Sequence, residues 1–300
     1  MEEIARDVAV VDMTISNAYL VGNSTSWVLV DSGTPGSAGT IKEAAEARFG
    51  PGAKPRAILL THGHFDHAGS APALAREWGV RVYAHRLEWP YLTGKSSYPP
   101  LDPTAPGVFS FMARFMPSRT VNVGRSLEEL GANLPELGLD DWSAHFTPGH
   151  TPGHLAFYRK SDGVLLAGDA VTTMNVDNLL DMLVKKQEVC RPPAPATTDW
   201  EQARRSVQLL AGLKPKLIAA GHGKPIANAT DELQRLADHF PVPKHGRYVQ
   251  ESARADESGI TYLPPPAFDP VPKIATGVAA AVVVAGVGAI ILKKRMGRGS

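Results

Sequence analysis

The chain has 300 residues, of which 43% are hydrophobic and 20% are charged, and this composition excludes a predominantly disordered protein. Lysine and arginine (31) nearly balance aspartate and glutamate (30), so no overall positive charge favours a nucleic-acid partner. The single cysteine, Cys190, excludes an intramolecular disulfide framework and fits a reducing compartment.

The N-terminal part of the chain predicts an α/β protein. Apolar runs separated by turn residues are typical of strands, and they cover residues 8–11, 19–21 and 27–30. The pattern then predicts a helix, a strand, a second helix and another strand, at residues 38–48, 57–60, 71–78 and 80–84. This β-α-β order is typical of a sheet covered by helices.

An insertion rich in proline, glycine and serine follows at residues 91–119. It encloses an apolar stretch at residues 108–116 that predicts one short helix. Two interpretations remain open for this insertion. Residues 91–116 form a lid over a substrate, or the helix fills part of the core.

Strands and helices return after the insertion. The pattern predicts three strands at residues 144–147, 155–158 and 164–168. Thr198 and Glu201 have the spacing of a capping box, which predicts the start of a helix that ends at Gly212. A strand at 217–220 and a helix at 230–239 complete the domain that we place at residues 1–240.

The C-terminal region has a different composition. Residues 241–273 are charged and rich in proline, which predicts a stiff linker. Residues 274–292 are nineteen residues without a charge, long enough to span about 28 Å as a helix, and a basic tail follows at 293–300. We predict a transmembrane helix at 274–292, the alternative being a buried helix of the soluble fold.

The predicted location is a membrane, through a single C-terminal anchor. The basic tail favours a cytoplasmic C-terminus, which would place the catalytic domain outside the cell or organelle. The acidic N-terminus does not resemble a secretory signal, so we predict instead that the catalytic domain is cytoplasmic.

Metal-binding residue types are concentrated directly after the predicted strand at 57–60. Within six positions the chain carries three histidines and one aspartate, namely His62, His64, Asp66 and His67. Imidazole and carboxylate groups are typical ligands of zinc and similar ions. The spacing places two imidazoles on one side of an extended loop and the other two groups opposite, which suits two adjacent ions.

This pattern resembles the metal motif His-x-His-x-Asp-His of the metallo-β-lactamase-fold hydrolase superfamily. The resemblance extends over about residues 8–230. It matches His150, Asp169 and His222 to the remaining metal ligands of the family, and Asp31 to an aspartate that usually follows an early strand. It implies an α/β fold, an αββα sandwich in which loops at one sheet edge build the site.

The resemblance also implies how the metal ions are held. His62, His64 and His150 would bind the first ion, Asp66, His67 and His222 the second, and Asp169 would bridge them. A hydroxide between two zinc ions would then be the nucleophile. We take Asp66 as a candidate catalytic residue as well as a ligand, and iron or manganese also fit these donors.

An aspartate at the bridging position resembles the glyoxalase II and lactonase branches of the superfamily. Two departures leave the substrate open, because Thr172 replaces a tyrosine common in lactonases, and no basic glutathione-binding region follows His222. We predict a zinc hydrolase that cleaves an ester, thioester or lactone bond of a small molecule. The alternatives are a mononuclear iron oxygenase similar to persulfide dioxygenases, and a phosphodiesterase or β-lactamase.

Other residues of these types have ordinary interpretations. His154 repeats the Thr-Pro-Gly-His sequence of His150 but begins a predicted strand, so we expect it to support the site rather than bind metal. Cys190 lies 21 positions after Asp169, whose ligand position is already filled, and we expect a free thiol in a loop. No role is predicted for His85, His145, His239 and His245.

Overall fold

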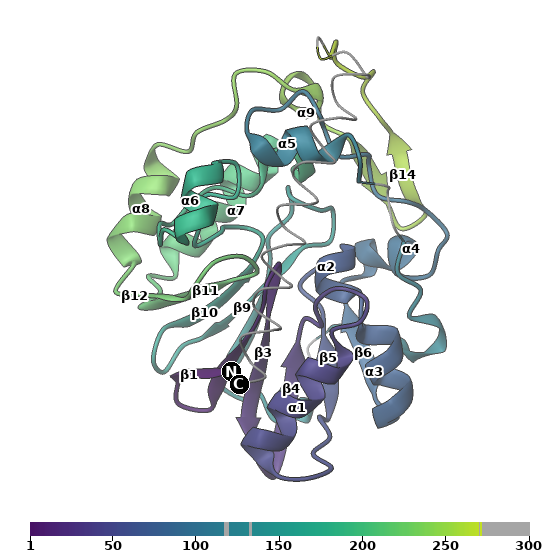
Figure 1. Ribbon diagram of the computed structural model, residues 1–300, viewed down its shortest axis with the longest axis vertical. Coiled ribbons are helices and arrows are strands. Elements are labelled where there is room, and N and C mark those ends of the chain that lie inside the picture. Colours follow the sequence, from purple (N-terminus) through teal and green to yellow (C-terminus); the bar gives the residue numbers. More distant parts are fainter. Residues whose placement is uncertain (117–119, 132–133, 270, 272–300) are drawn as a thin grey trace, which may run out of the picture.

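The protein folds into two sheets that lie face to face (Figure 1). The computed structural model describes residues 1–116, 120–131, 134–269 and 271. The first sheet has seven strands in chain order. They are β1 (Glu2–Ala5), β2 (Val8–Met13), β3 (Ser16–Asn23), β4 (Ser26–Val30), β5 (Ala57–Leu59), β6 (Arg81–Ala84) and β7 (Leu127–Glu129).

The second sheet has five strands in the order β12-β11-β10-β9-β8. Its strands are β8 (Trp142–Phe146), β9 (Leu155–Arg159), β10 (Val164–Gly168), β11 (Leu217–Ala220) and β12 (Ile226–Ala227). In the first sheet β4 to β7 are parallel, and in the second β10 and β11 are parallel. Parallel neighbours bring loops that follow their carboxyl ends to the same edge.

Buried residues between the sheets form the central core, with Tyr19 and Val28 from the first sheet facing Phe157 and Leu166 of the second. The opposite faces also carry buried clusters. Leu20 and Leu29 pack against helices α1 (Ala38–Phe49) and α3 (Ala71–Trp78), and Leu165 and Ile218 pack against α7 (Trp200–Gly212) and α8 (Thr230–Asp238). The four layers are therefore helix, sheet, sheet and helix, which confirms the predicted αββα sandwich.

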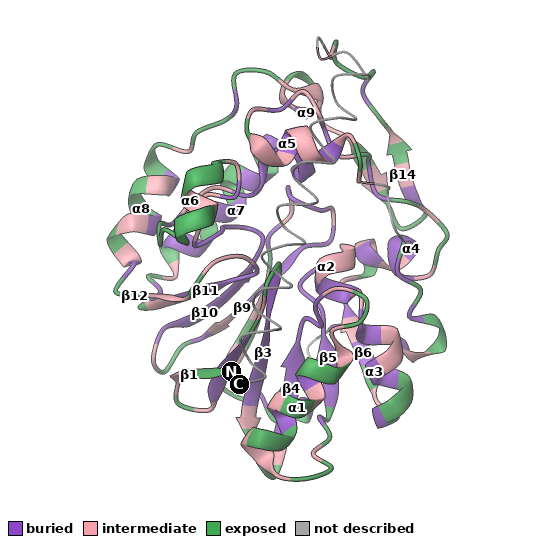
Figure 2. Ribbon diagram, viewed as in Figure 1, coloured by how far each residue is buried: buried purple, intermediate pink, exposed green. Residues whose placement is uncertain are grey.

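The inner strands are almost continuously apolar because both of their faces are covered. Figure 2 shows β3, β4, β9 and β10 mostly in the colour of buried residues. Such runs lack the alternation of apolar and polar residues that is typical of a half-exposed strand. They were identified in the sequence because they are short and are flanked by turn residues.

One predicted helix start is wrong. Helix α7 begins at Trp200, and its N-cap is Asp199, whose side chain accepts a hydrogen bond from the Gln202 backbone N–H at 2.9 Å. Thr198 and Glu201 therefore do not form a capping box. Threonine and aspartate are both common N-cap residues, and they stand next to each other here. The sequence alone therefore could not show which of the two accepts the free N–H groups of the first turn.

Several short elements were not predicted. In the described chain these are β1, β7, β12, α2 (Phe65–Ala68), α4 (Trp89–Leu92), α6 (Leu179–Val184), α9 (Arg247–Gln250), β13 (Arg254–Asp256), β14 (Gly259–Tyr262) and four 3-10 turns. The short strands have only two to four residues, too few for a periodic pattern. Their pairing partners supply the hydrogen bonds that define them.

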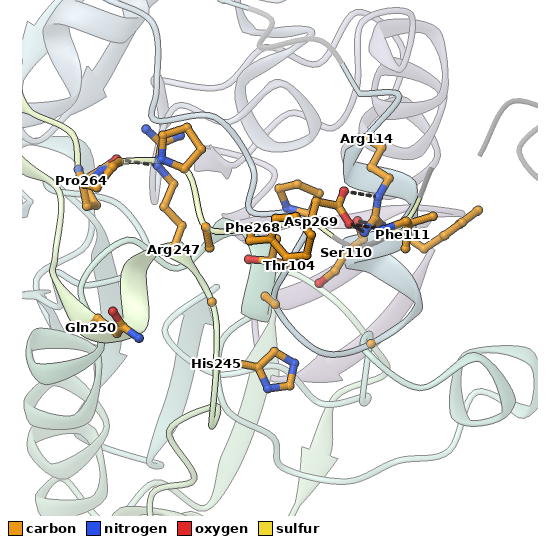
Figure 3. A pocket seen from close by; sticks show the side chains of 18 of the residues that line it. Thr104, Ser110, Phe111, Arg114, His245, Arg247, Gln250, Pro264, Phe268 and Asp269 are labelled. Carbon is orange, nitrogen blue, oxygen red and sulfur yellow. Dashed lines mark hydrogen bonds and ion pairs between the residues drawn. The ribbon is translucent and has the colours of Figure 1, made fainter. Parts of the chain in front are cut away.

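The segment predicted as a linker contains structure. Strands β13 and β14 form an antiparallel hairpin, and Arg247 Nε donates to the Pro264 carbonyl oxygen at 2.8 Å. Further on, Asp269 pairs with both Arg114 Nε (2.8 Å) and Arg114 Nη2 (2.7 Å) (Figure 3). This part of 241–273 therefore folds back onto the insertion.

Helix α5 (Val108–Ala113) is the short helix predicted in the insertion. Of its residues only Ser110 and Ala113 are buried, while Phe109 and Phe111 are half-buried. This burial does not fit a helix that fills the core. The lid interpretation remains a prediction.

The predicted transmembrane helix at 274–292 lies outside the described residues. Within the part of the chain that is described, no helix combines the length and the apolar character that crossing a bilayer requires.

Candidate metal centre

All seven predicted metal ligands meet at one edge of the two sheets. His62 and His64 follow β5, and Asp66 and His67 lie in α2. From the second sheet, His150, Asp169 and His222 follow β8, β10 and β11. The hydrogen bond from the Leu155 N–H to the Thr61 carbonyl oxygen, at 2.8 Å, joins the two sheets beside the cluster.

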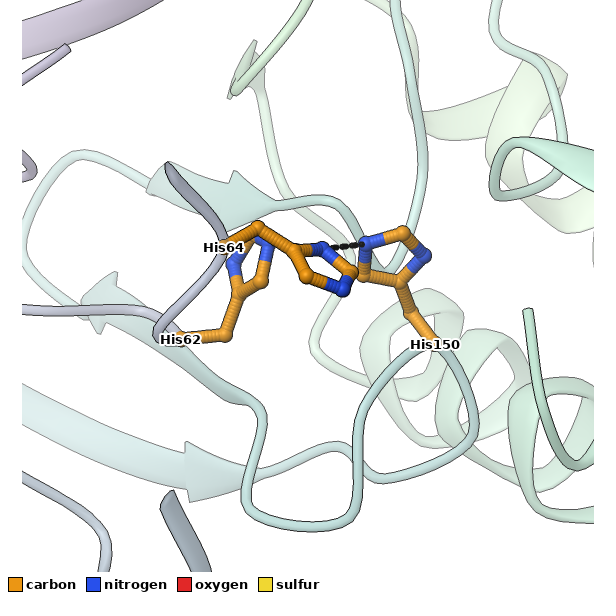
Figure 4. A group of neighbouring side chains, drawn as sticks. All are labelled: His62, His64 and His150. Atoms are coloured by element: carbon orange, nitrogen blue, oxygen red, sulfur yellow. Dashed lines mark hydrogen bonds between the residues drawn. The ribbon is translucent and has the colours of Figure 1, made fainter. Parts of the chain in front are cut away.

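Three histidines form the first group of potential metal ligands (Figure 4). His64 Nδ1 lies 3.0 Å from His62 Nε2 and 3.0 Å from His150 Nε2. Burial lowers the pKa of His64 to about 4 and holds the pKa values of His62 and His150 well below the usual range. These imidazoles are therefore neutral near pH 7, which is the form that binds a metal.

The second group contains Asp66, His67 and His222. Asp66 Oδ2 lies 3.5 Å from His222 Nε2 and 3.8 Å from His67 Nε2. His222 Nδ1 donates to the Ile15 carbonyl oxygen at 2.7 Å, which directs Nε2 toward the cluster. This arrangement gives the second group one carboxylate oxygen and two imidazole nitrogens.

Asp169 lies between the two groups. Its Oδ2 is 3.1 Å from His222 Nε2 and 3.5 Å from His150 Nε2, and its Oδ1 is 3.5 Å from His67 Nε2. Burial alone would raise the pKa of Asp169, but His222 and His67 outweigh it and hold that pKa well below the usual range. The carboxylate is ionised and contacts residues of both groups, as a bridging ligand must.

The donor atoms fit metal ions better than they fit one another. His67 Nε2 and Asp169 Oδ1 are buried without a hydrogen-bond partner. An unsatisfied buried polar atom costs about 1–3 kcal/mol, so a cation among these donors would remove an unfavourable term. The residues form a His/Asp cluster of the dinuclear type, whose donors suit zinc, iron and manganese.

Asp31 supports the second group. Its Oδ2 accepts a hydrogen bond from His67 Nδ1 at 2.9 Å, and its Oδ1 accepts one from the Thr61 N–H at 2.8 Å. The bond to Asp31 occupies His67 Nδ1 and turns Nε2 toward Asp66 and Asp169, so Nε2 is the atom that would bind a metal. Sequence reasoning marked Asp31 only by its position, and the structure shows what its carboxylate contacts.

His154 supports Asp169 from behind. It is fully buried, and its Nε2 accepts a hydrogen bond from the Asp169 N–H at 2.9 Å. Its Nδ1 donates to Thr147 Oγ1 at 2.8 Å. Both ring nitrogens are thus occupied, which agrees with the prediction that His154 supports the site.

Sequence reasoning missed Glu88 and Tyr98. Glu88 is fully buried, and its carboxylate accepts hydrogen bonds from the backbone N–H groups of Gly63 (2.9 Å) and Gly153 (2.6 Å). The Tyr98 hydroxyl donates to the same carboxylate, and the Tyr98 ring lies 4.5 Å from the His64 ring. The Glu88 carboxylate therefore links the two loops that carry His62, His64 and His150. The sequence around Glu88 contains no pattern that predicts this role.

Removing the Glu88 carboxylate should loosen both loops. We expect Glu88→Ala to lower the free energy of unfolding by about 2–4 kcal/mol, because two N–H groups and a hydroxyl lose their acceptor. Metal affinity should fall roughly 10–100-fold. Chelator competition and denaturant unfolding measure the two effects. Glu129→Ala, at an exposed glutamate on β7, is the matched control and should change neither.

Cys190 is a free thiol that pairs through its backbone with Thr172. Burial raises the pKa of the thiol to about 12, so almost none is thiolate near pH 7. We expect the native protein to react with an aromatic disulfide reagent at least about 100-fold more slowly than the unfolded chain. Equal rates before and after unfolding would contradict this burial.

Comparison with known proteins gives consistent matches. The family model of the metallo-beta-lactamase superfamily matches residues 11–222, which include all seven candidate ligands. The probable metallo-hydrolase YflN of Bacillus subtilis (strain 168) is 40% identical over 244 residues, covering 79% of this chain and 92% of that protein. A hydroxyacylglutathione hydrolase of Acidiphilium cryptum (strain JF-5) is 26% identical, covering 81% of this chain and 79% of that protein.

Solved structures agree on the fold. The crystal structure of BLEG-1 B3 metallo-beta-lactamase superimposes with a TM-score of 0.52 at 25% identity, covering 75% of this chain and 93% of that chain.

Proposed function

The chain belongs to the metallo-β-lactamase superfamily, and we propose that it is a dinuclear zinc hydrolase acting on an ester, thioester or lactone of a small molecule. One observation carries the proposal most directly, the placement of Asp169. Its carboxylate contacts His150 of the first group and both His67 and His222 of the second. A single bridging carboxylate supports two ions side by side.

Two ions bound there would supply an acidified water as nucleophile and a Lewis acid for the oxygen of the scissile bond. The protein's own contribution is to orient the donors. Asp31 and His154 fix His67 and Asp169 through hydrogen bonds to the sides that face away from the cluster. Asp66, the least buried ligand carboxylate, is our candidate for handling a proton near the substrate, because its side chain remains 15% exposed.

The choice of bond rests on the bridging aspartate and on the relatives. Hydroxyacylglutathione hydrolase is the name of several relatives, and a thioester is therefore one natural substrate class to test. Zinc is proposed because histidine and carboxylate donors at two adjacent sites suit its flexible coordination. The contrasting proposal, a mononuclear iron oxygenase, would use three of the seven donors and leave the others without a role.

Metal analysis and a substrate panel test this proposal together. The full chain would be loaded with zinc or with iron and offered thioesters, esters, lactones, β-lactams, phosphodiesters and persulfides. We expect two ions per chain and turnover of one of the first three classes. Oxygen consumption with a persulfide by protein holding one iron would contradict the hydrolase proposal.

We also propose that residues 274–292 anchor the enzyme to a membrane, with the catalytic domain on the cytoplasmic side. The uncharged run of nineteen residues before Lys293, Lys294 and Arg295 supports this. Fractionation of cells that express the chain with and without residues 274–300 is the test. Full-length protein found wholly in the soluble fraction would contradict the anchor, and digestion by protease added to intact cells would contradict the orientation.

A further inference from the structure

Helix α6 exposes apolar side chains to solvent. Leu179, Leu180, Leu183 and Val184 are 51%, 71%, 61% and 72% exposed, and no residue of the helix is buried. Figure 2 shows α6 mostly in the colour of exposed residues. Single exposed apolar residues are ordinary, but four within one six-residue helix form a contiguous patch that calls for a partner.

The apolar side of this helix, rather than its polar side, faces solvent. Positions 179, 180, 183 and 184 lie on one side because residues three and four apart are neighbours on a helix. Asp181 lies on the other side and is less exposed than the leucines. Burial does not hold this helix in place. Its first turn is instead capped by Asn178, whose side chain accepts from the N–H groups of Leu180 (2.9 Å) and Asp181 (3.3 Å).

The segment that carries α6 is bonded at both ends to residues next to the metal centre. The backbone of His222 accepts a hydrogen bond from the Thr173 N–H at 3.0 Å, and Thr173 leads into α6. The side chain of His222 donates to Ile15, which is itself 55% exposed. Lys185, which follows α6, pairs with Asp12 at 3.3 Å and joins the helix to the end of β2, next to the turn that carries Ile15. We call the exposed apolar side chains of Ile15, Leu179, Leu180, Leu183 and Val184 the apolar rim.

The last described residues are linked to this helix through α5. Asp269 pairs with Arg114, the residue that follows α5, and at the other end of α5 the Val108 N–H donates to the Asp177 carbonyl oxygen at 3.0 Å. Asp177 directly precedes the N-cap of α6. Figure 1 shows α5 and α9 at the top of the molecule and α6 lower, beside α7 and α8. One short helix, α5, therefore separates α6 from the last described residues before the apolar run at 274–292.

We propose that the apolar rim rests on a lipid bilayer, so that the metal centre opens at the membrane interface. This inference rests on the proposed anchor at 274–292, but it does not depend on the metal chemistry. An apolar helix side inserts into the boundary between head groups and acyl chains, and lysines at its end remain at the level of the head groups. Lys185 and Lys186 occupy that place directly after Val184.

A polarity-sensitive fluorophore attached to α6 tests the proposal in the full chain. Cys190→Ser removes the native thiol, and Leu183→Cys provides the attachment point. With vesicles of phosphatidylcholine and phosphatidylglycerol, we expect the emission to shift to shorter wavelength. Bromine atoms placed on the upper acyl chain should quench it, because an interfacial helix lies about 5–10 Å below the surface.

The matched control carries the label at Leu209→Cys on α7, a leucine that is also exposed but lies outside the rim. Its emission should not change with vesicles. Protein that binds vesicles while the label at 183 stays in water would overturn the proposal and leave the anchor intact. A shift that needs no vesicles and grows with protein concentration would overturn it in favour of a second copy of the chain. Protein that does not bind vesicles at all would overturn both proposals, and the hydrolase assay would be unaffected.

Discussion

Asp169→Ala should lower hydrolytic activity by about 10³-fold and leave fewer than two ions bound per chain. The reason is geometric, since the Asp169 carboxylate contacts His67, His150 and His222 and is the group shared by both clusters. Without it, Asp66 is the one remaining carboxylate among the seven candidate ligands. Elemental analysis of the purified variant and steady-state rates on the best substrate of the panel measure the two effects.

His154→Ala is the informative control for that variant. It removes the acceptor of the Asp169 N–H but none of the seven candidate ligands. We expect it to cost about 1–3 kcal/mol of unfolding free energy and to keep two ions. If Asp169→Ala kept both ions and full turnover, the bridging assignment would be wrong. If His154→Ala lost both ions, His154 would itself be part of the metal site.

Removing the metal ions should lower the thermal stability strongly. The cluster gathers five histidines and two aspartates in a small volume, and donor atoms such as His67 Nε2 and Asp169 Oδ1 have no hydrogen-bond partner there. A ligand that binds only the folded state stabilises it by mass action, and metal ions held by several protein donors typically contribute several kcal/mol. For a domain of this size we expect the midpoint of thermal unfolding to fall by about 10–20 °C in a chelator.

Measuring the thermal midpoint of Asp169→Ala with and without chelator tests whether the stabilising ions bind at this cluster. The variant should begin with a lower midpoint and should lose less on chelation, because part of the metal contribution is already absent. Restoring zinc to the chelated parent should restore its midpoint. An unchanged midpoint in protein shown by elemental analysis to be free of metal would contradict a stabilising role for the ions.

The sequence by itself determined the elements whose information is local. The strand at 27–30 carries a continuous apolar run and the helix at 71–78 carries apolar residues at helical spacing, and the structure confirms both. The four metal-binding residues from His62 to His67 are so close in sequence that a shared metal site can be inferred without the fold. His150, Asp169 and His222 were assigned because their order along the chain resembles that of a known family, and the structure brings all three to the same edge.

Other features were decided only by the tertiary structure, because they depend on which atoms meet across long stretches of chain. Glu88 is separated from Gly153 by 65 positions, and only folding turns its carboxylate toward two ligand-bearing loops. Likewise, α6 has an apolar sequence that would fit a buried helix, and only the packing shows its apolar side facing outward. The periodicity of apolar residues predicts that a helix is amphipathic. Which side faces solvent depends on the elements that pack against the helix.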